Sequence, residues 1–219
     1  MPKLIDLSHT IEEGMITYKG LPAPVICDFL SRETSSQQYG NQETFQIGKI
    51  EMVANTGTYI DVPFHRYEQG KDLAESTLPE FTLLKGLVVS VPFMETKAID
   101  AFHFEGLDLE GKAVLVHTGW DKNWRTDSYF EENPFLTESA ANFLMESGVK
   151  LVGIDSLNID DTTTNVRPVH SILLKENILI VEHLTGLEQI PENDFHFSAI
   201  PPKIKGVGSF PVRAFASIP

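Results

Sequence analysis

Hydrophobic and polar positions recur with two different periods along the chain, and the first half shows the shorter period. Residues 49–53 alternate between polar and apolar side chains with a period of two. Residues 86–91 and 113–117 are short apolar runs, rich in β-branched side chains and bounded by turn residues. Both patterns are typical of strands. The first half is therefore predicted to consist mostly of short strands and loops.

The second half of the chain alternates helical and strand patterns. A helix is predicted over residues 137–147, where Thr137 can serve as the N-cap, and a strand is predicted over residues 150–154. A second helix is predicted over residues 168–176, because proline is tolerated at the first helical position. The apolar run at residues 178–181 is typical of a buried strand. This order predicts an α/β core with some parallel pairing, although the strand-rich first half argues against a simple doubly wound sheet.

Length and composition restrict the class of protein. The 219 residues show no internal repeat, low-complexity block or linker, so residues 1–219 are predicted to form a single domain. With 42% hydrophobic and 22% charged residues, the composition is that of an ordinary globular protein and not of a disordered acidic tail. The 31 acidic and 17 basic residues give a formal net charge of −14. That balance argues against a nucleic-acid partner and against binding to an anionic membrane surface.

Targeting signals and cysteine content restrict the compartment and the chemistry. No apolar run approaches the roughly 18 residues that a bilayer span requires, and the N-terminus lacks the apolar segment of a secretory leader. Cys27 is the only cysteine, which excludes an internal disulfide and a thiolate-rich metal site. The Gly-x-Ser-x-Gly and phosphate-loop motifs are also absent. We therefore expect a cytoplasmic protein with no membrane partner, in which any metal site must use His, Asp and Glu.

The densest group of polar side chains lies in residues 55–65. Four of its members are separated by even numbers and would share one face of an ideal strand: Asn55, Tyr59, Asp61 and His65. In a straight strand the first and third of them would lie roughly 20 Å apart. Gly57 and Pro63 allow the chain to bend, which could gather all four around one pocket. The alternative is an ordinary turn whose Asn and Asp side chains satisfy local backbone groups.

Carboxylates follow two of the predicted buried strands. Glu182 follows the run 178–181, and Asp155 follows residues 151–154. An unpaired carboxylate in a buried strand costs several kcal/mol, so each is expected to have a cation, a proton or good hydrogen-bond donors. The alternative is an exposed strand end. His170, in the first turn of the second predicted helix, is by itself more often a surface or hydrogen-bonded residue than a ligand.

Residues 55–65 resemble the motif His-x-Gly-Thr-His-x-Asp-x-Pro-x-His of the cyclase-like metal hydrolases, a family that includes bacterial kynurenine formamidase. Five positions of the motif agree: Gly57, Thr58, Asp61, Pro63 and His65. Further similarities occur in order along nearly the whole chain, at residues 6–9, 117–120, 152–160, 170–174, 180–184 and 211–214. The resemblance implies a single α/β domain whose mixed β core, barrel-like or sandwich-like (the swivelling β/β/α type), is flanked by a few helices.

The resemblance also implies a metal site. By position, Asp61, His170 and Glu182 correspond to metal ligands of the family, and His65 corresponds to its general acid/base. Two ligand histidines of the family are replaced, by Asn55 and Tyr59. An amide oxygen is a weak ligand, and a phenol with an ordinary pKa of about 10 must lose its proton before it binds well. We therefore expect a reduced site that holds one divalent ion, zinc or manganese.

The resulting hypothesis is a hydrolase, similar to an arylformamidase, that acts on C–N bonds other than peptide bonds. The ion would activate water for attack on a small amide, formamide or lactone, while His65 transfers the proton and Tyr59 donates a hydrogen bond to the oxyanion. The resemblance further implies a small-molecule substrate and a homodimer or homotetramer. Two alternatives stay open. One is a catalytically degenerate member that binds a small carbonyl ligand, and the other is a metal-independent acid/base enzyme that uses His65 with Glu182 or Tyr59.

Overall fold

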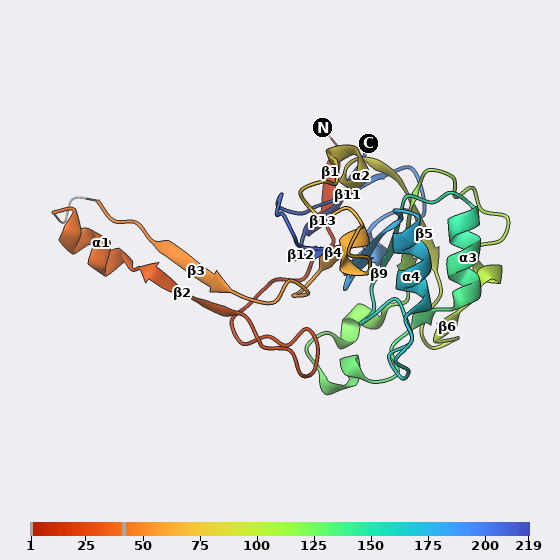
Figure 1. Cartoon of the computed structure of the whole chain (residues 1–219), viewed down its shortest axis with the longest axis horizontal. Helices are drawn as coiled ribbons and strands as arrows, with labels where there is room; N and C mark the ends of the chain where they lie inside the picture. The colour runs from red at the N-terminus through yellow and green to blue at the C-terminus, as the bar shows by residue number, and fades with distance from the viewer. Residues whose placement is uncertain (1, 41–42) are drawn as a thin grey trace.

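Nine strands form one curled, mixed sheet in the computed structural model, which describes residues 2–40 and 43–219 (Figure 1). In spatial order they are β1 (Lys3–Asp6), β13 (Arg213–Ile218), β11 (His196–Ile200), β5 (Leu84–Ser90), β7 (Ala113–His117), β9 (Leu151–Ile154), β10 (Leu179–Glu182), β4 (Tyr59–Asp61) and β12 (Ser209–Pro211). The central strands β5, β7, β9 and β10 pair in parallel. Antiparallel strands flank them on both sides. The predicted α/β fold with a mixed β core is confirmed.

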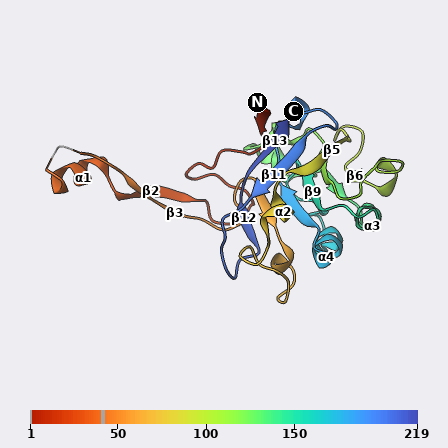
Figure 2. The ribbon, with the colours of Figure 1, turned by 90° about the horizontal axis from the view of Figure 1, so that it is seen from above.

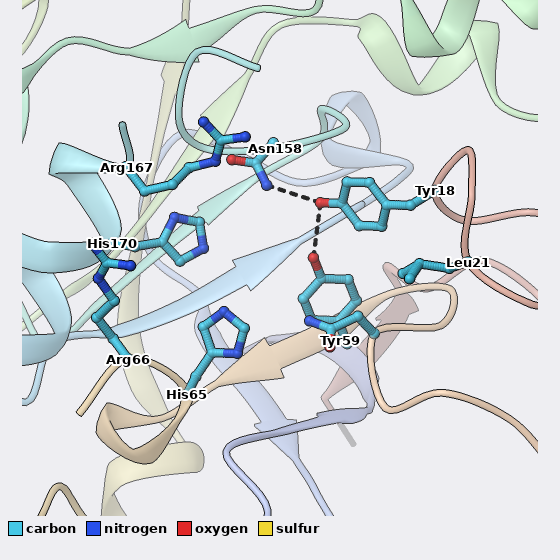
Figure 3. A pocket seen from close by; sticks show the side chains of 9 residues that line it. Tyr18, Leu21, Tyr59, His65, Arg66, Asn158, Arg167 and His170 are labelled. Atoms are coloured by element: carbon cyan, nitrogen blue, oxygen red, sulfur yellow. Dashed lines mark hydrogen bonds between the residues drawn. The ribbon is translucent and has the colours of Figure 1, made fainter. Parts of the chain in front are cut away.

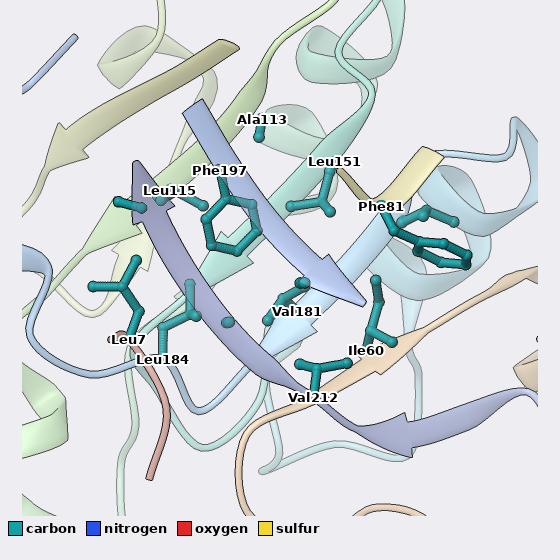
Figure 4. Close-up of a cluster of buried hydrophobic side chains, with 14 of the residues drawn as sticks. Leu7, Ile60, Phe81, Ala113, Leu115, Leu151, Val181, Leu184, Phe197 and Val212 are labelled. Carbon is teal, nitrogen blue, oxygen red and sulfur yellow. The ribbon is translucent and has the colours of Figure 1, made fainter. Parts of the chain in front are cut away.

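The two ends of the sheet curl toward each other around a shared core. Val212 joins β12, at one edge, directly to β13, next to the opposite edge. Ser8, just beyond β1, forms an isolated bridge with Leu184, just beyond β10. Side chains from both ends, such as Leu7 and Ile60, therefore meet in one apolar cluster inside the curl (Figure 4).

Both faces of the central strands are buried, as β7 illustrates. Ala113 and Leu115 belong to the cluster inside the curl, whereas Val114 and Val116 pack in the cluster beneath the helices. All four side chains are fully buried. The sequence of a strand that is covered on both faces is a continuous apolar run without alternation, which explains the pattern of residues 113–117.

Helices α3 (Glu138–Glu146) and α4 (Pro168–Lys175) contact each other and lie on the same side of the sheet (Figure 2). The Thr137 hydroxyl accepts a hydrogen bond from the amide of Ala140, which is the predicted N-cap. Gly148 follows α3 with a positive φ of 72°, the conformation that commonly ends a helix. The chain runs from β9 through α4 to β10, and these two strands pair in parallel. Both predicted helices and the parallel strands around the second are confirmed.

The remaining elements of this domain are short. They are η1 (Pro63–His65), α2 (Leu78–Phe81), β6 (Ala98–Ile99), η2 (Ala101–His103), η3 (Trp120–Asn123), η4 (Asp127–Phe130), β8 (Phe135–Leu136) and η5 (Leu187–Gln189), where η denotes a 3-10 helix. The strands β6 and β8 pair in parallel as a separate two-stranded sheet. Among the described residues, no helix has the length and apolar character needed to cross a bilayer.

A two-stranded arm projects away from the curled sheet in both views (Figures 1 and 2). It consists of β2 (Val25–Leu30), α1 (Arg32–Gln38) and β3 (Ile47–Glu51), and β2 pairs with β3 in a sheet of their own. Large apolar side chains of the arm are exposed, among them Phe29 at 76% and Ile50 at 60%. A lone two-stranded hairpin is marginally stable in water. The arm thus exposes an apolar surface in the single chain.

The strand predicted from the alternation of residues 49–53 lies in this arm. It is observed as β3, which ends at Glu51, two residues earlier than the pattern indicates. Alternation normally marks a strand with one covered face. Every residue of β3 is exposed in the single chain, so the covering surface is not supplied by the domain itself.

We expect the arm to contact a second copy of this chain, because its apolar side chains must be covered and identical arms can pair about a two-fold axis. Analytical ultracentrifugation should show the full chain as a dimer or larger assembly, and a Phe29→Ser/Ile50→Ser variant as a monomer. Met94→Ser changes a side chain outside the arm that is 81% exposed, and this control should leave the assembly unchanged. A monomeric full chain at micromolar concentration would contradict the expectation.

Candidate functional site

A cavity of about 270 Å³ lies beside β4 and the N-terminal end of α4 (Figure 3). Its lining comes from segments far apart in the sequence: Tyr18, Leu21, Asn55, Tyr59, His65, Arg66, Asn158, Arg167 and His170. Four residues singled out in the sequence, at positions 55, 59, 65 and 170, therefore line the same space. Asp61 and Glu182 do not line it and are fully buried behind these side chains.

The polar stretch 55–65 forms β4 and η1 and bends at both predicted positions. Gly57 has a φ of 65°, a left-handed conformation that favours glycine. Pro63 begins η1, which carries His65. Gly208 lies against this turn so closely that a Cβ there would be 2.2 Å from the backbone nitrogen of His65. The bends place the ends of the stretch at one cavity, so the straight-strand geometry does not apply.

The antiparallel pairing of β4 with β10 sets three of the predicted residues side by side. Tyr59 lies directly opposite Glu182, and Asp61 lies opposite Ile180. Directly opposed side chains project to the same face of a sheet, as do residues two positions apart on one strand. Tyr59, Asp61 and Glu182 therefore share one face, and His170 of α4 lies over it.

Asp61 and Glu182, distant in the sequence, both lie beside the imidazole of His170. His170 Nε2 lies 3.6 Å from Asp61 Oδ2 and 3.7 Å from Glu182 Oε1. The Asp61 Oδ2 atom is buried and has no hydrogen-bond partner among the described residues. His65 reaches the same place, since one ligand atom each of Asp61, His65 and His170 lies within 4.8 Å of the others. The structure thus places Asp61 and Glu182 beside His170, and His65 beside Asp61 and His170, while their roles as metal ligands and proton-transfer group stay predictions.

Carboxylates surround the His170 imidazole. Its Nδ1 lies 2.6 Å from Asp160 Oδ2, which leaves Nε2 facing Asp61 and Glu182. Burial lowers the pKa of His170, but the hydrogen bond to Asp160 and the nearby carboxylates of Asp61 and Glu182 outweigh that effect and raise it well above its usual range. Burial, together with the charge of Asp61, raises the pKa of Glu182. Both shifts mean that this group of three carboxylates and one imidazole favours an added positive charge, either a proton or a cation.

The Tyr59 hydroxyl and one backbone amide hold Glu182, and Tyr18 lies beside them. The Tyr59 hydroxyl donates a short hydrogen bond to Glu182 Oε2. The Tyr18 hydroxyl lies 3.2 Å from the same oxygen and 2.6 Å from the Leu157 carbonyl oxygen, which is the nearer acceptor for its single proton. The Ile159 amide donates to Oε1 at 2.7 Å. Asn158 Nδ2 donates to the Tyr18 hydroxyl at 2.9 Å. Burial and the charge of Glu182 raise the pKa of both phenols well above their usual range, so both remain neutral donors.

Ser209 links Asp61 to His65. Its hydroxyl donates a short hydrogen bond to Asp61 Oδ1 and lies 2.8 Å from His65 Nδ1. The His65 side chain is 34% exposed and lines the cavity. Because its Nδ1 is engaged by Ser209, the nitrogen left for a bound molecule is Nε2.

Sequence reasoning missed several residues of this site: Tyr18, Arg66, Asn158, Asp160, Arg167 and Ser209. Some of them had an indirect signal. Arg66 adjoins His65, and Asn158 and Asp160 lie in the stretch 152–160 that resembles the family. Tyr18 had none, because only the folded chain brings it to β10.

Asp155, the other carboxylate at a predicted strand end, takes part in a turn and does not line the cavity. It is fully buried. Its Oδ1 accepts hydrogen bonds from the amide of Thr118 at 2.9 Å and from the Thr118 hydroxyl at 2.5 Å, and its Oδ2 accepts one from the amide of Gly119 at 2.7 Å. Good donors therefore satisfy this carboxylate, and it ties the end of β9 to the turn after β7.

Asp155→Asn should lower the free energy of unfolding by about 1–3 kcal/mol, because the new amide group would face a buried backbone donor. Urea denaturation would measure the change. Asp127→Asn, at an exposed position of η4, is the control and should change stability by less than about 0.5 kcal/mol. Equal stability of the two variants would show that the buried hydrogen bonds of Asp155 contribute little to the free energy of unfolding.

The donor set fits a divalent cation. Asp61 Oδ2 is buried without a partner, and His170 Nε2 faces two carboxylates. The other ring nitrogen of His170 is held by Asp160, the arrangement that orients ligating histidines in metal sites. Imidazole and carboxylate groups suit zinc and manganese.

Comparison with known sequences gives consistent results. The family described as "Putative cyclase" matches residues 5–161. Kynurenine formamidase of Geobacillus thermodenitrificans is 31% identical over 212 residues, covering 96% of this chain and 95% of the relative. Kynurenine formamidase of Bacillus cereus is 26% identical over 214 residues, again covering 96% of this chain and 95% of the relative.

Solved structures share the fold along the whole chain. One, described as "The Structure Of Potential Metal-Dependent Hydrolase With Cyclase Activity", has a TM-score of 0.79 and 27% identity, and the match covers 100% of this chain and 99% of the other. Isatin hydrolase A from Labrenzia aggregata, bound to benzyl benzoate, has a TM-score of 0.84 and 20% identity, with coverage of 99% and 94%; this likeness shows the fold alone. On the family match and the full-length relatives, the chain belongs to the cyclase family.

Proposed function

We propose that this chain is a cyclase-family hydrolase, similar to an arylformamidase, that cleaves a small formamide or amide or opens a lactone with the help of a single divalent ion. The full-length relatives named kynurenine formamidase support the reaction class. The observation that carries the proposal is the position of the His170 imidazole beside both Asp61 and Glu182, together with the buried oxygen of Asp61 that lacks a partner.

Asp61, His170 and Glu182 would hold the ion, zinc or manganese, with Asp160 orienting the His170 ring. When bound, such an ion polarises a carbonyl group and makes water nucleophilic at neutral pH. The buried carboxylates supply the negative charge that a desolvated cation needs. Without it, the buried group takes up protons instead, on the His170 imidazole and on Glu182, which is the direction of both pKa shifts at this site.

His65 is proposed to transfer the proton. Its imidazole reaches the buried group and also lines the cavity, so it lies between the ligands and a bound substrate. Ser209 engages Nδ1 and fixes the orientation of the ring. From Nε2 the ring can take a proton from the attacking water and return it to the leaving amine or alkoxide, the usual work of an imidazole in hydrolysis.

Tyr59 has two possible partners for its hydroxyl. In the structure the hydroxyl donates to Glu182. The Tyr18 hydroxyl lies 2.6 Å from the Leu157 carbonyl oxygen, its nearer acceptor, and can replace Tyr59 by turning its proton to the same Glu182 oxygen, 3.2 Å away. That exchange would free Tyr59 to donate to an oxyanion in the cavity that it lines. Burial and the charge of Glu182 raise its pKa, so the hydroxyl stays protonated and able to donate.

The purified protein should contain about one zinc or manganese ion per chain, measured by inductively coupled plasma mass spectrometry. Asp61→Asn should lose the ion, and Asp127→Asn should keep it. A chelator should abolish hydrolysis of N-formyl aromatic amides, and the metal should restore it. The Asn55→His/Tyr59→His double variant should raise the content toward about two ions, since it adds two imidazole ligands.

Other outcomes of the metal analysis would point to the alternative functions. Hydrolysis by a metal-free protein would indicate an acid/base enzyme that uses His65. Binding of small carbonyl ligands with neither metal nor turnover would indicate a degenerate member of the family.

His65→Ala should lower kcat by about 10²- to 10⁴-fold while the ion content stays unchanged, because the substitution removes the proton-transfer group and leaves the ligands. Tyr59→Phe should lower kcat by about 10²-fold if the hydroxyl stabilises the oxyanion. Stopped assays and metal analysis on the same samples measure both quantities. Loss of the ion from His65→Ala would instead make His65 a ligand.

A further inference from the structure

Two arginines line the cavity without carboxylate partners, although the chain carries an excess of acidic residues. Arg66 and Arg167, like Arg32 of the arm, form no ion pair within the described part of the chain, whereas Arg125 lies 2.6 Å from Glu12 and Arg213 lies 2.6 Å from Asp6. In a chain of net charge −14, two unpaired guanidinium groups that line one cavity need an explanation. An anionic ligand would provide it.

Protein contacts hold the Arg167 guanidinium in place. Its Nη1 donates to three backbone carbonyl oxygens, those of Asp161 at 3.0 Å, Thr164 at 2.7 Å and Val166 at 2.8 Å. These bonds engage one nitrogen of the group. Nε and Nη2 have no hydrogen-bond partner in the described chain and remain able to donate.

Ser171 ties Arg66 to the same structure. Arg66 Nε donates to the Ser171 hydroxyl at 3.1 Å, and that hydroxyl donates to the Arg167 carbonyl oxygen at 2.8 Å. The Tyr67 hydroxyl donates to the Ser171 carbonyl oxygen at 2.7 Å. η1 and the start of α4 are thereby joined, and both terminal nitrogens of Arg66 lack a partner in the described residues. Less conformational freedom is lost when groups held in this way bind a ligand.

The cavity has a cationic side and an apolar side. In Figure 3, Arg66 and Arg167 lie on one side, Tyr18 and Leu21 lie on the opposite side, and His65 stands between them. A ligand that fills this space would place an anionic group on the arginines and an aromatic or aliphatic part against the tyrosine and leucine. Its reacting carbonyl would then lie near His65.

We propose that Arg66 and Arg167 bind a carboxylate of the substrate, so that the enzyme prefers formamides, amides or lactones that carry a carboxylate over their neutral analogues. This inference rests on the proposed function for its reaction but not for its binding site. A carboxylate matches the planar, multiply donating guanidinium group. The two arginines also offset the repulsion that the acidic chain and the buried Asp61 and Glu182 exert on an anion.

A matched pair of substrates tests the preference: 2-formamidobenzoate and its methyl ester, which differ in the charge of one group. In Arg66→Gln/Arg167→Gln, kcat/KM for the acid should fall by about 10- to 100-fold, mostly through KM, because charge-assisted hydrogen bonds are lost. For the ester it should change by less than about twofold. Lys150→Gln removes one positive charge just before β9, at a position that does not line the cavity. It is the control and should leave kcat/KM for both substrates unchanged. An unchanged acid-to-ester ratio in the double variant would overturn the proposal while the hydrolase assignment stands.

A binding measurement separates this site from the reaction. Isothermal titration of the wild-type protein with benzoate, and with benzamide as the neutral analogue, should show preference for benzoate. The double variant should lose that preference and Lys150→Gln should keep it. If no formamide is hydrolysed but this pattern holds, the proposed function fails and the carboxylate site stands. Equal binding of benzoate by the wild type and the double variant would overturn the site.

Conservative variants keep the test valid if the double variant folds poorly. Arg66→Lys/Arg167→Lys retains the charge but loses the planar fork, so it should recover part of the acid-to-ester ratio. Ser171→Ala removes only the group that positions Arg66, and it should raise KM for the acid with kcat nearly unchanged. An identical ratio in the lysine and glutamine double variants would overturn a role for the charge.

Discussion

The structure depends on a buried group of charges that cannot be left uncompensated. Asp61 and Glu182 project from neighbouring strands to one face, and His170 lies over them with Asp160 behind it. Burial of each unpaired carboxylate would cost several kcal/mol, so the fold must supply donors, protons or a cation. It supplies Tyr59, Ile159 and Ser209 as donors but leaves one oxygen of Asp61 without any. That missing partner connects the energetics of the fold to a cation site.

The curl of the sheet is what brings these groups into one place. β4 joins the parallel strands on their outer side through β10, and β12 continues around the curl into β13. β12 carries Ser209 next to Asp61, and the preceding Gly208 allows His65 to approach closely. A side chain at position 208 would force the η1 turn away and move the imidazole from the cavity. The same packing that closes the apolar core therefore sets the position of the proton-transfer group.

Asn55 and Tyr59, at the two positions where the family's motif has histidines, line the cavity. The phenol of Tyr59 lies beside Glu182, with Tyr18 next to it. In the proposed single-ion site, the neutral hydroxyl of Tyr59 compensates the carboxylate by hydrogen bonding, where a second cation would do so by charge. Arg66 and Arg167 stand on the other side of the reacting groups and are free to compensate a charge that arrives with a ligand.

The sequence alone was sufficient for much of the local structure and for three of the buried polar groups, Asp61, His170 and Glu182. Periodicity located α3, α4 and the parallel strands, because a packed face imposes its period on the side chains. The placement of Glu182 after an apolar strand indicated a carboxylate that needs compensation, and residues 55–65 supplied the resemblance. The sequence predicted the strand β3 but not its place in a projecting arm, because alternation indicates one covered face and not the surface that covers it. Only the tertiary structure decided that Ser209 positions His65, that Tyr18 reaches Glu182, and that Arg66 and Arg167 share one cavity. These contacts join segments more than 100 positions apart, and their geometry follows from how the sheet curls and pairs, which no local pattern encodes.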